Sequence, residues 1–501
     1  MIKELWEQAA AGNDVRQNLS RLRQEIKKEP AAGRQLAKLL KEQGQSECLL
    51  GFLKDEDAKT RKNAALLMGD LGEQDFMAPV FAAYMAETQL FVKSAYVTAM
   101  KNFDCREQME TLKARLEELT KAELTEENRK HILEEQRELS DLIVMTEGVQ
   151  THKFIGYDEK FQVVLITNRN HQETAVRELL ELEPGAETEI FNSGVRASVG
   201  NLHWAGRHRT YQELLFAVKG MAACPMEAVK AAKVIAESEL LPFLNRNHEG
   251  KPPYYFRVEL KTKMEAAAKA EFAKRFSGEL ERLSGRKLIN TTSRYEFEIR
   301  LVENKAGNFN LLIKLGTLKD NRFSYRKEVT ALSIRPYNAA LTAALTKKWM
   351  TEGGQVLDPF CGVGTMLIER HKAVGAGSSY GVDIQAEAIE KARINTEAAG
   401  QLIHFINRDF FDFKHDYLFD EIITDMPFAI GKLGAEDIGR FYRRFFAAAP
   451  ALLKTSGIVI LYSHDKDYVK NFAPKEGFSI LEEYEISMKE GTYVFVLRKN
   501  Q

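Results

Sequence analysis

Two glycines follow an aspartate in the segment LDPFCGVGT, between an apolar run and a helical segment. Gly362 and Gly364 lack a Cβ atom, so the backbone there can adopt unusual dihedral angles and approach a ligand closely. The helix that follows would offer its N-terminal N–H groups to an anionic group. Leu367 breaks the dinucleotide-binding pattern, and no Gly-Lys-Ser/Thr sequence follows, so neither a pyrophosphate loop nor a P-loop fits this segment.

Two acidic residues end predicted strands downstream of this loop. Asp383 can accept hydrogen bonds from both hydroxyls of a ribose. Asp409, in NRDFF, can accept from an adenine amino group, with the backbone or the ring of Phe410 close to the base. A single aspartate at a strand end is usually a helix cap. The glycine loop and both acids, in this order, predict a site for S-adenosylmethionine.

The stretch TDMPFAIGK (424–432) holds an acid, a proline and an aromatic ring directly after the apolar run FDEII. An exocyclic base amine is a weak nucleophile because its lone pair is delocalised into the ring, and two hydrogen-bond acceptors can localise and aim it. Asp425 would supply one acceptor and the carbonyl of Met426 the other, which Pro427 would hold outward. Phe428 would stack on an extruded base. The alternative is a helix cap after a buried strand.

These residues lie in a region where predicted strands and helices alternate. We expect strands in QVLDPF, SYGVDI, INRDFF, FDEIITD and GIVILYS, with amphipathic helices between them. Strands that are each followed by a helix form a doubly wound, mainly parallel sheet, with its ligand site at the carboxyl ends of the strands. The sequence therefore predicts a Rossmann-like α/β domain in residues 331–501.

Composition is typical of a multidomain globular protein. The chain has 501 residues, of which 44% are hydrophobic and 29% charged. No stretch approaches the roughly 18 apolar residues of a membrane span, and the charged N-terminus does not resemble a secretion signal. Four widely separated cysteines without metal-ligand spacing favour a reducing cytoplasm and no metal site. Cys361 lies inside the glycine loop with no paired base, so we interpret it as a packing residue.

Residues 1–150 are helical in pattern almost throughout. The segments 52–72 and 89–104 align Ala64 with Ala95, a period of 31 residues. This spacing resembles HEAT-type helical repeats, whose faces become buried by stacking on neighbours, although a plain helical bundle is the alternative. Such a helical region could recruit a protein partner.

Residues 151–330 change to strands alternating with helices, which predicts one or two small α+β units. Within them, residues 251–330 hold 18 Lys and Arg against 10 Asp and Glu, a local net charge of +8. Such an excess suits a nucleic-acid phosphate backbone, and a solvated surface is the alternative.

Residues 331–501 resemble the class I methyltransferase domain of the THUMP-containing RNA methyltransferases. The resemblance rests on LSIRPYNAALTAAL (332–345), LDPFCGVGTMLIE (357–369), YGVDI (380–384), RDFFDF (408–413) and TDMPFAIGK (424–432). It implies that residues 151–330 are a ferredoxin-like plus THUMP unit that binds RNA.

Amine-methylating enzymes often carry two prolines in the catalytic motif. Met426 stands in place of the first one here, which removes a rigid ring but keeps a carbonyl.

The resemblance also assigns roles to individual residues. It implies that the cofactor is held by Arg335, Pro336, Asp358, Phe360, Cys361, Gly362, Gly364, Thr365, Asp383, Ile384, Asp409 and Phe410. It implies a catalytic set of Asp425, Met426, Pro427 and Phe428, and Lys432 beyond them could contact a phosphate or solvent.

Within that family, the catalytic motif resembles that of the tRNA guanine-N2 methyltransferases. We therefore expect methyl transfer from S-adenosylmethionine to guanine N2 in tRNA. The alternatives are the same chemistry on ribosomal RNA or on an adenine N6 amine, and an RNA- or protein-binding scaffold with an inactive methyltransferase domain.

Overall fold

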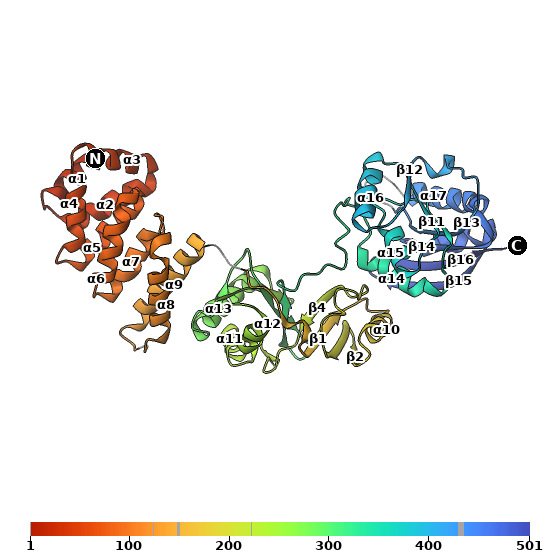
Figure 1. Ribbon diagram of the computed structural model, residues 1–501, viewed down its shortest axis with the longest axis horizontal. Coiled ribbons are helices and arrows are strands. Elements are labelled where there is room, and N and C mark those ends of the chain that lie inside the picture. The colour runs from red at the N-terminus through yellow and green to blue at the C-terminus, as the bar shows by residue number, and fades with distance from the viewer. Residues whose placement is uncertain (1, 124, 148–150, 222, 429–434, 501) are drawn as a thin grey trace. The chain divides into compact units, whose positions relative to one another are not determined.

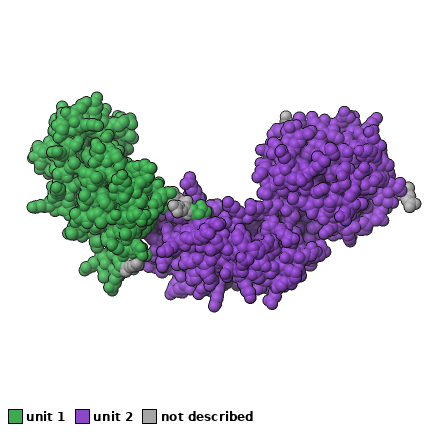
Figure 2. Space-filling view, in the orientation of Figure 1, with its two compact units in different colours: residues 1–151 green, residues 152–501 purple. Residues whose placement is uncertain are grey.

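The chain divides into two compact units, Met1–Thr151 and His152–Gln501 (Figure 2). The computed structural model describes residues 2–123, 125–147, 151–221, 223–428 and 435–500. Each unit has a hydrophobic core of its own. Among the described residues, no helix combines the length and the apolar character that crossing a bilayer requires.

The described residues of the first unit form helices and connecting turns (Figure 1). Its α-helices are α1 (Ile2–Ala10), α2 (Val15–Lys28), α3 (Pro30–Glu42), α4 (Ser46–Gly51), α5 (Ala58–Leu71), α6 (Met77–Ala86), α7 (Leu90–Met100), α8 (Met109–Lys121) and α9 (Arg129–Glu147). Helices α2, α5, α7 and α9 contact one another in succession. They form a continuous row of packed helices.

Two of these helices pack very closely. A Cβ atom at Gly69 of α5 would lie 2.6 Å from Cα of Ala99 in α7, so only glycine allows this approach. Ala64 and Ala95, which the 31-residue period aligns, are both buried, at 0% and 4% exposure. Small residues therefore let α5 and α7 meet, and the assignment of these helices to HEAT-type repeats stays a prediction.

The first half of the second unit is one mixed sheet with helices on it. Its strands are β1 (Phe161–Ile166), β2 (Glu187–Phe191), β3 (Gly194–Val199), β4 (Glu213–Phe216), β5 (Cys224–Pro225), β6 (Tyr254–Lys261), β7 (Leu288–Asn290), β8 (Phe297–Glu303) and β9 (Asn308–Leu315). Its helices are α10 (Gln172–Leu182), α11 (Ala228–Ala236), α12 (Leu240–Asn247) and α13 (Ala266–Leu283).

The sheet order is β2-β3-β1-β4-β9-β8-β6-β7, with β5 paired to β9. Strand β4 joins β9 where Phe216 lies opposite Ile313, so the strands before and after this point form one sheet with one shared core. The sequence predicted one or two α+β units here, and its assignment to a THUMP unit stays a prediction.

The second half of this unit is a seven-stranded sheet in the order β12-β11-β10-β13-β14-β16-β15. Its strands are β10 (Gln355–Asp358), β11 (Ser378–Asp383), β12 (His404–Asn407), β13 (Phe419–Asp425), β14 (Leu453–Ser463), β15 (Phe478–Ser487) and β16 (Thr492–Lys499). Its helices are α14 (Pro336–Thr346), α15 (Thr365–Ala373), α16 (Ala386–Ala398), α17 (Ala435–Ala448) and α18 (Lys466–Phe472).

The first five of these strands are parallel, and β16 is antiparallel to both of its neighbours. Helices α14, α15 and α16 cover one face of the sheet, where strand residues such as Val356 and Ile423 point (Figure 1). Helices α17 and α18 cover the other face, where strand residues such as Leu357 and Ile422 point. Burial on both faces explains why these central strands are apolar runs. This is the doubly wound α/β fold that the sequence predicted.

Candidate active site

The parallel strands end at one edge of the sheet, and their register brings the predicted acids together there. Asp358 ends β10 opposite Gly381 in β11, and Asp383 ends β11. Asp425 ends β13 opposite Tyr462 in β14. Three of the predicted acidic residues therefore end neighbouring strands at their carboxyl edge, which is where ligands of such sheets bind.

The glycine loop is fastened to the adjacent strand β11. The N–H of Cys361 donates to the carbonyl of Val382 at 3.0 Å, and the N–H of Gly362 donates to Oδ2 of Asp383 at 2.9 Å. Gly362 and Gly364 have φ angles of 50° and 82°. This left-handed region favours glycine, so the loop needs both residues.

Two side chains of this loop differ in their roles. Cys361 is 5% exposed, and burial raises the pKa of its thiol well above the usual value, so it is a packing residue rather than a nucleophile. Thr365 begins α15, and its buried Oγ1 has no hydrogen-bond partner within the part of the chain that the structure describes. A buried polar atom without a partner is what a bound polar ligand could satisfy.

Asp358 is almost entirely buried, at 1% exposure. Its Oδ1 accepts from Oγ1 of Thr424 at 2.6 Å and from the N–H of Phe360 at 3.1 Å. Burial raises the pKa of Asp358 to about 8, although these hydrogen bonds oppose the rise. Asp358 is therefore mostly protonated at neutral pH, and it fastens the end of β10 to β13.

Asp383 is held by backbone groups on both of its oxygens. Besides Gly362, the N–H of Gln385 donates to Oδ1 at 2.8 Å. A carboxylate has about four acceptor sites, so two remain for ribose hydroxyls. The next residue, Ile384, is 68% exposed although it is aliphatic. A fixed carboxylate beside an exposed apolar side chain fits an adenosine group.

The third parallel strand ends earlier than the sequence indicated. Strand β12 stops at Asn407, and Asp409 precedes a short helical turn, where its Oδ1 accepts the N–H of Phe411 at 3.0 Å. The ring of Phe410 is 3% exposed and packs against the ring of Phe360, with 5.3 Å between centroids. Phe410 belongs to the core and the partly buried Phe360 packs against it, which leaves the backbone of Phe410 as the part that could face a base.

The catalytic motif continues β13 beyond its last residue. Met426 is fully buried, and its N–H donates to the carbonyl of Tyr462 at 2.8 Å. Oδ1 of Asp425 is buried and accepts no hydrogen bond from any described residue, although Nε2 of His464 lies 3.4 Å away. Burial raises the pKa of Asp425, and the His464 imidazole opposes that rise. A carboxylate oxygen is thus left available at this strand end.

His464 is a site residue that sequence reasoning missed. It follows β14 directly, and its ring stacks on Phe428 with 3.9 Å between centroids and an angle of 23° between planes. The same imidazole contacts Asp425, so one side chain supports two residues of the motif. A histidine immediately after the strand that pairs with β13 was the signal that could have identified it.

Arg335 and Pro336 lie where α14 begins. Pro336 is its first residue, and Nη1 of Arg335 donates to Oη of Tyr337 at 2.6 Å. Nδ2 of Asn338 donates to Oη of Tyr462 at 3.3 Å, which ties the first turn of α14 to the end of β14. The start of α14 therefore lies beside the carboxyl edge of the sheet.

One predicted contact involves a segment that the structure does not describe. Gly431 and Lys432 lie outside the described residues, so the contact of Lys432 with a phosphate stays a prediction. Among the described residues there is no group of three or more His, Cys, Asp or Glu side chains that could hold a metal ion.

Comparison with known proteins places this site in a methyltransferase domain. Residues 331–490 match the family model described as "RMKL-like, methyltransferase domain". A stretch of 138 residues is 31% identical to a tRNA (guanine(10)-N2)-dimethyltransferase of Methanothermobacter thermautotrophicus, covering 27% of this chain and 40% of that protein. A ribosomal protein L11 methyltransferase of Thermotoga maritima is 29% identical over 136 residues, covering 27% of this chain and 48% of that protein. The chain thus spans less than half the length of the curated relatives it matches.

Solved structures resemble the second unit as a whole. TrmN from Thermus thermophilus aligns with a TM-score of 0.50 and 21% identity, over 68% of this chain and 99% of that one. SMU.472, a putative methyltransferase complexed with SAH, aligns with a TM-score of 0.52 and 15% identity, over 68% and 99%. At these identities the likeness shows the fold. The family match and the fold identify a methyltransferase domain whose cofactor is S-adenosylmethionine.

Proposed function

We propose that this protein methylates an exocyclic base amine of RNA, and that its substrate is guanine N2 in tRNA. The observation that carries the proposal is the buried Oδ1 of Asp425 at the end of β13, which accepts no hydrogen bond from a described residue. An amine becomes a better nucleophile when a carboxylate accepts one of its hydrogens, because the lone pair then leaves conjugation with the base. The strand order puts this acceptor next to the strand that carries Asp358 and the glycine loop.

The rest of the motif would hold the base. Phe428 offers a flat ring for stacking, and His464 covers one of its faces, so the base would stack on the other. The carbonyl of Met426 would be the second acceptor, and Pro427 would limit its movement. Its buried side chain fixes Met426 in the core, which replaces the rigidity that a proline ring would give.

The cofactor would lie along the ends of β10, β11 and β12. The glycine loop and Thr365 would line its methionine end, Asp383 would hold the ribose, and Asp409 with the Phe410 backbone would face the adenine. The sulfonium of S-adenosylmethionine supplies an activated methyl group. The protein's own task is therefore to align the amine and exclude water.

Guanine N2 in tRNA is supported by the catalytic-motif resemblance and by the tRNA (guanine(10)-N2)-dimethyltransferase relative. The basic 251–330 region would bind the RNA backbone in the cytoplasm, by shape and phosphate contacts rather than by sequence. The helical first unit could add a protein partner.

The test is nucleoside mass spectrometry of tRNA and ribosomal RNA from a strain that lacks the gene. Loss of N2-methylguanosine from tRNA, restored by the gene, is the expected result. Loss from ribosomal RNA alone, or loss of N6-methyladenosine, would move the substrate to the alternatives. Unchanged nucleosides together with loss of a methylated protein amine would reject an RNA substrate.

A further inference from the structure

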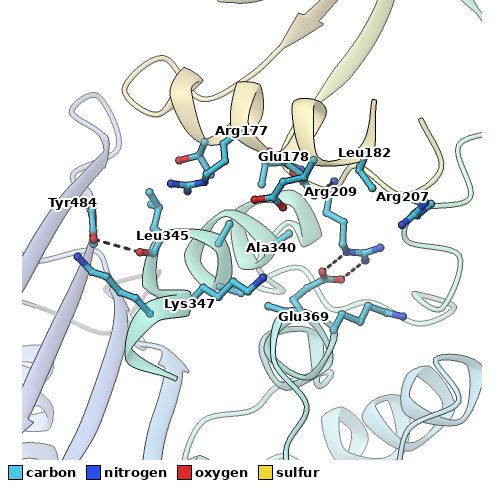
Figure 3. Close-up of a pocket in the computed structure, with 18 residues that line it drawn as sticks. Arg177, Glu178, Leu182, Arg207, Arg209, Ala340, Leu345, Lys347, Glu369 and Tyr484 are labelled. Atoms are coloured by element: carbon cyan, nitrogen blue, oxygen red, sulfur yellow. Dashed lines mark hydrogen bonds and ion pairs between the residues drawn. The ribbon is translucent and has the colours of Figure 1, made fainter. Parts of the chain in front are cut away.

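A cleft of about 740 Å³ opens between the two halves of the second unit, away from the strand ends. Figure 3 shows α10 on one side of it and α14 and α15 on the other. Its floor is formed by Ala340, Ala343 and Ala344 of α14, whose small side chains leave the space open. Nothing in the proposed methyl transfer uses this cleft.

The cleft is preformed because its walls are joined on one side by a charged cluster. Arg209 donates from Nε and Nη2 to the two carboxylate oxygens of Glu369, at 2.7 and 2.6 Å (Figure 3). Oη of Tyr325 donates to the same carboxylate at 2.6 Å, and Nη1 of Arg209 donates to the carbonyl of Arg322 at 2.9 Å. These bidentate and buried contacts fix geometry as well as charge.

A second set of contacts joins the walls on the other side. Nδ2 of Asn168 donates to the carbonyl of Ile486 at 2.9 Å, and Nε2 of His171 lies 2.9 Å from the carbonyl of Glu485. Oη of Tyr484, in the same strand, donates to the carbonyl of Leu345 at 3.3 Å. The cleft is thus held open between two anchored edges.

The charges that remain in the cleft are mostly positive. Glu369 is neutralised by Arg209, and Glu178 accepts the N–H groups of Arg209 and Thr210 at 2.8 and 3.1 Å. Lys348 pairs with Glu482. Four other cations line the cleft, are exposed and make no ion pair with a described residue: Arg177, Arg207, Lys347 and Lys372. Two lining acids also keep their charge: Glu178 contacts the imidazole of His208, whose pKa burial lowers, and Glu181 makes no ion pair with a described residue. The four cations outnumber these two carboxylates.

We propose that this cleft binds backbone phosphates of the RNA substrate, which rests on the function proposed above. The four cations come from α10, from the loop before β4, from the end of α14 and from α15, so they surround an open cleft rather than one enclosed point. Such an arrangement suits an extended polyanion. Helix α14 leads from the active-site edge to the cleft, and its 11 residues span about 15 Å. One RNA stem could therefore contact the cleft while its flipped base occupies the site.

The test reverses charge at two positions that touch neither the cofactor loop nor the catalytic motif. The double variant Lys347→Glu with Lys372→Glu is compared with Lys475→Glu, another exposed lysine without an ion pair among the described residues. Because phosphate contacts bind the ground state and the transition state alike, KM for tRNA should rise at least about tenfold while kcat stays within about twofold. The slope of log affinity against log salt should fall by about two. The Lys475 variant should match the wild type.

RNA affinity and a salt slope equal to those of the wild type would overturn the cleft as a phosphate site. Arg207→Glu, a second exposed change on the opposite wall, should reproduce the effect, and its failure to do so counts against the proposal. A wild type that binds RNA through these residues but methylates no base would reject the proposed function and keep the cleft. Tight binding of a mononucleotide, lost in the double variant, would assign the cleft to a free nucleotide instead.

Discussion

At the carboxyl edge of the sheet, three acids accept hydrogen bonds from backbone groups of the described fold, whereas Oδ1 of the fourth accepts none from a described residue. Asp358, Asp383 and Asp409 accept hydrogen bonds from backbone N–H groups, and Asp358 also accepts from Thr424. Asp425 has an Oδ1 that accepts nothing from the described residues, with His464 beside it. The first three help to fix the backbone around the proposed cofactor site. Oδ1 of Asp425 remains available to a donor that none of the described residues supplies.

This difference explains why the acids should respond differently to mutation. A carboxylate that already accepts backbone hydrogen bonds helps to hold the loop to which a cofactor binds, so its loss should affect binding and stability. A carboxylate with a free oxygen contributes little to the fold, so its loss should affect the chemical step alone.

The largest expected effect is at Asp425. Asp425→Ala should lower kcat for RNA methylation by more than about a thousandfold, because it removes the carboxylate acceptor and leaves the amine with the Met426 carbonyl alone. Binding of S-adenosylhomocysteine, measured by calorimetry, should stay within about threefold of the wild type. Asp425→Asn, which keeps one acceptor oxygen, should retain more activity than the alanine variant. Activity near that of the wild type in Asp425→Ala would remove the residue from the mechanism.

A smaller effect is expected at Asp383, on the affinity for S-adenosylhomocysteine and not on kcat. Asp383→Ala removes the acceptor for Gly362 and Gln385, and it should weaken S-adenosylhomocysteine binding by about 10- to 100-fold. Asp416→Ala, an exposed carboxylate of the same domain, is the control and should bind normally. Equal binding by the two variants would show that Asp383 does not hold the cofactor.

His464 should affect activity through the pKa of Asp425 and the position of the Phe428 ring. Activity requires ionised Asp425, whose pKa is raised by burial, so activity should be lost as pH falls through that raised pKa, at a higher pH than for an ordinary aspartate. His464→Gln removes the group that opposes the rise, so the acidic limb of the kcat profile should move to higher pH. His464→Ala should also lower kcat about tenfold through loss of stacking. An unshifted limb in both variants would leave His464 a packing residue.

The smallest effect concerns the pH dependence of stability at Asp358. Its pKa is about 8 in the folded chain and about 3.9 when unfolded, so the folded state binds more protons between these values. The free energy of unfolding should therefore fall as pH rises from about 4 to about 8. Asp358→Asn should reduce this fall by at least about 1 kcal/mol, measured by denaturant unfolding of the full chain. At pH 4 the ionisation of Asp358 should contribute little to the difference in the free energy of unfolding between the wild type and Asp358→Asn. If the free energy of unfolding of both proteins changed equally with pH, the raised pKa of Asp358 would be contradicted.

The sequence predicted the parts of this architecture that depend on local pattern. Apolar runs followed by acids indicated the ends of β10, β11 and β13. The two glycines indicated the loop, because a left-handed backbone conformation favours glycine. The end of β12 was misplaced by two residues, since Asn407 and Asp409 are both plausible strand-end polar residues. The ring of Phe410 was open to two interpretations because the sequence does not show which side of a turn faces the core.

Features that combine distant segments could not be predicted in this way. His464 joins the site because β14 pairs with β13, and only the strand order reveals that neighbour. The basic cleft draws single residues from four separate elements, none of which lies in the 251–330 segment where the local charge excess stands out. Basic residues that only the fold brings together do not form a cluster along the sequence.

The proposed methylation of guanine N2 through Asp425 is tested most directly by methyl transfer from the purified full-length chain to unmodified tRNA, followed by nucleoside mass spectrometry. The Asp425→Ala variant is measured in parallel. We expect N2-methylguanosine in the tRNA treated with the wild type and none above background with the variant. A wild type that binds S-adenosylhomocysteine but forms no methylated guanosine in tRNA would contradict guanine N2 of tRNA as the substrate. A variant that forms it as fast as the wild type would contradict the role of Asp425.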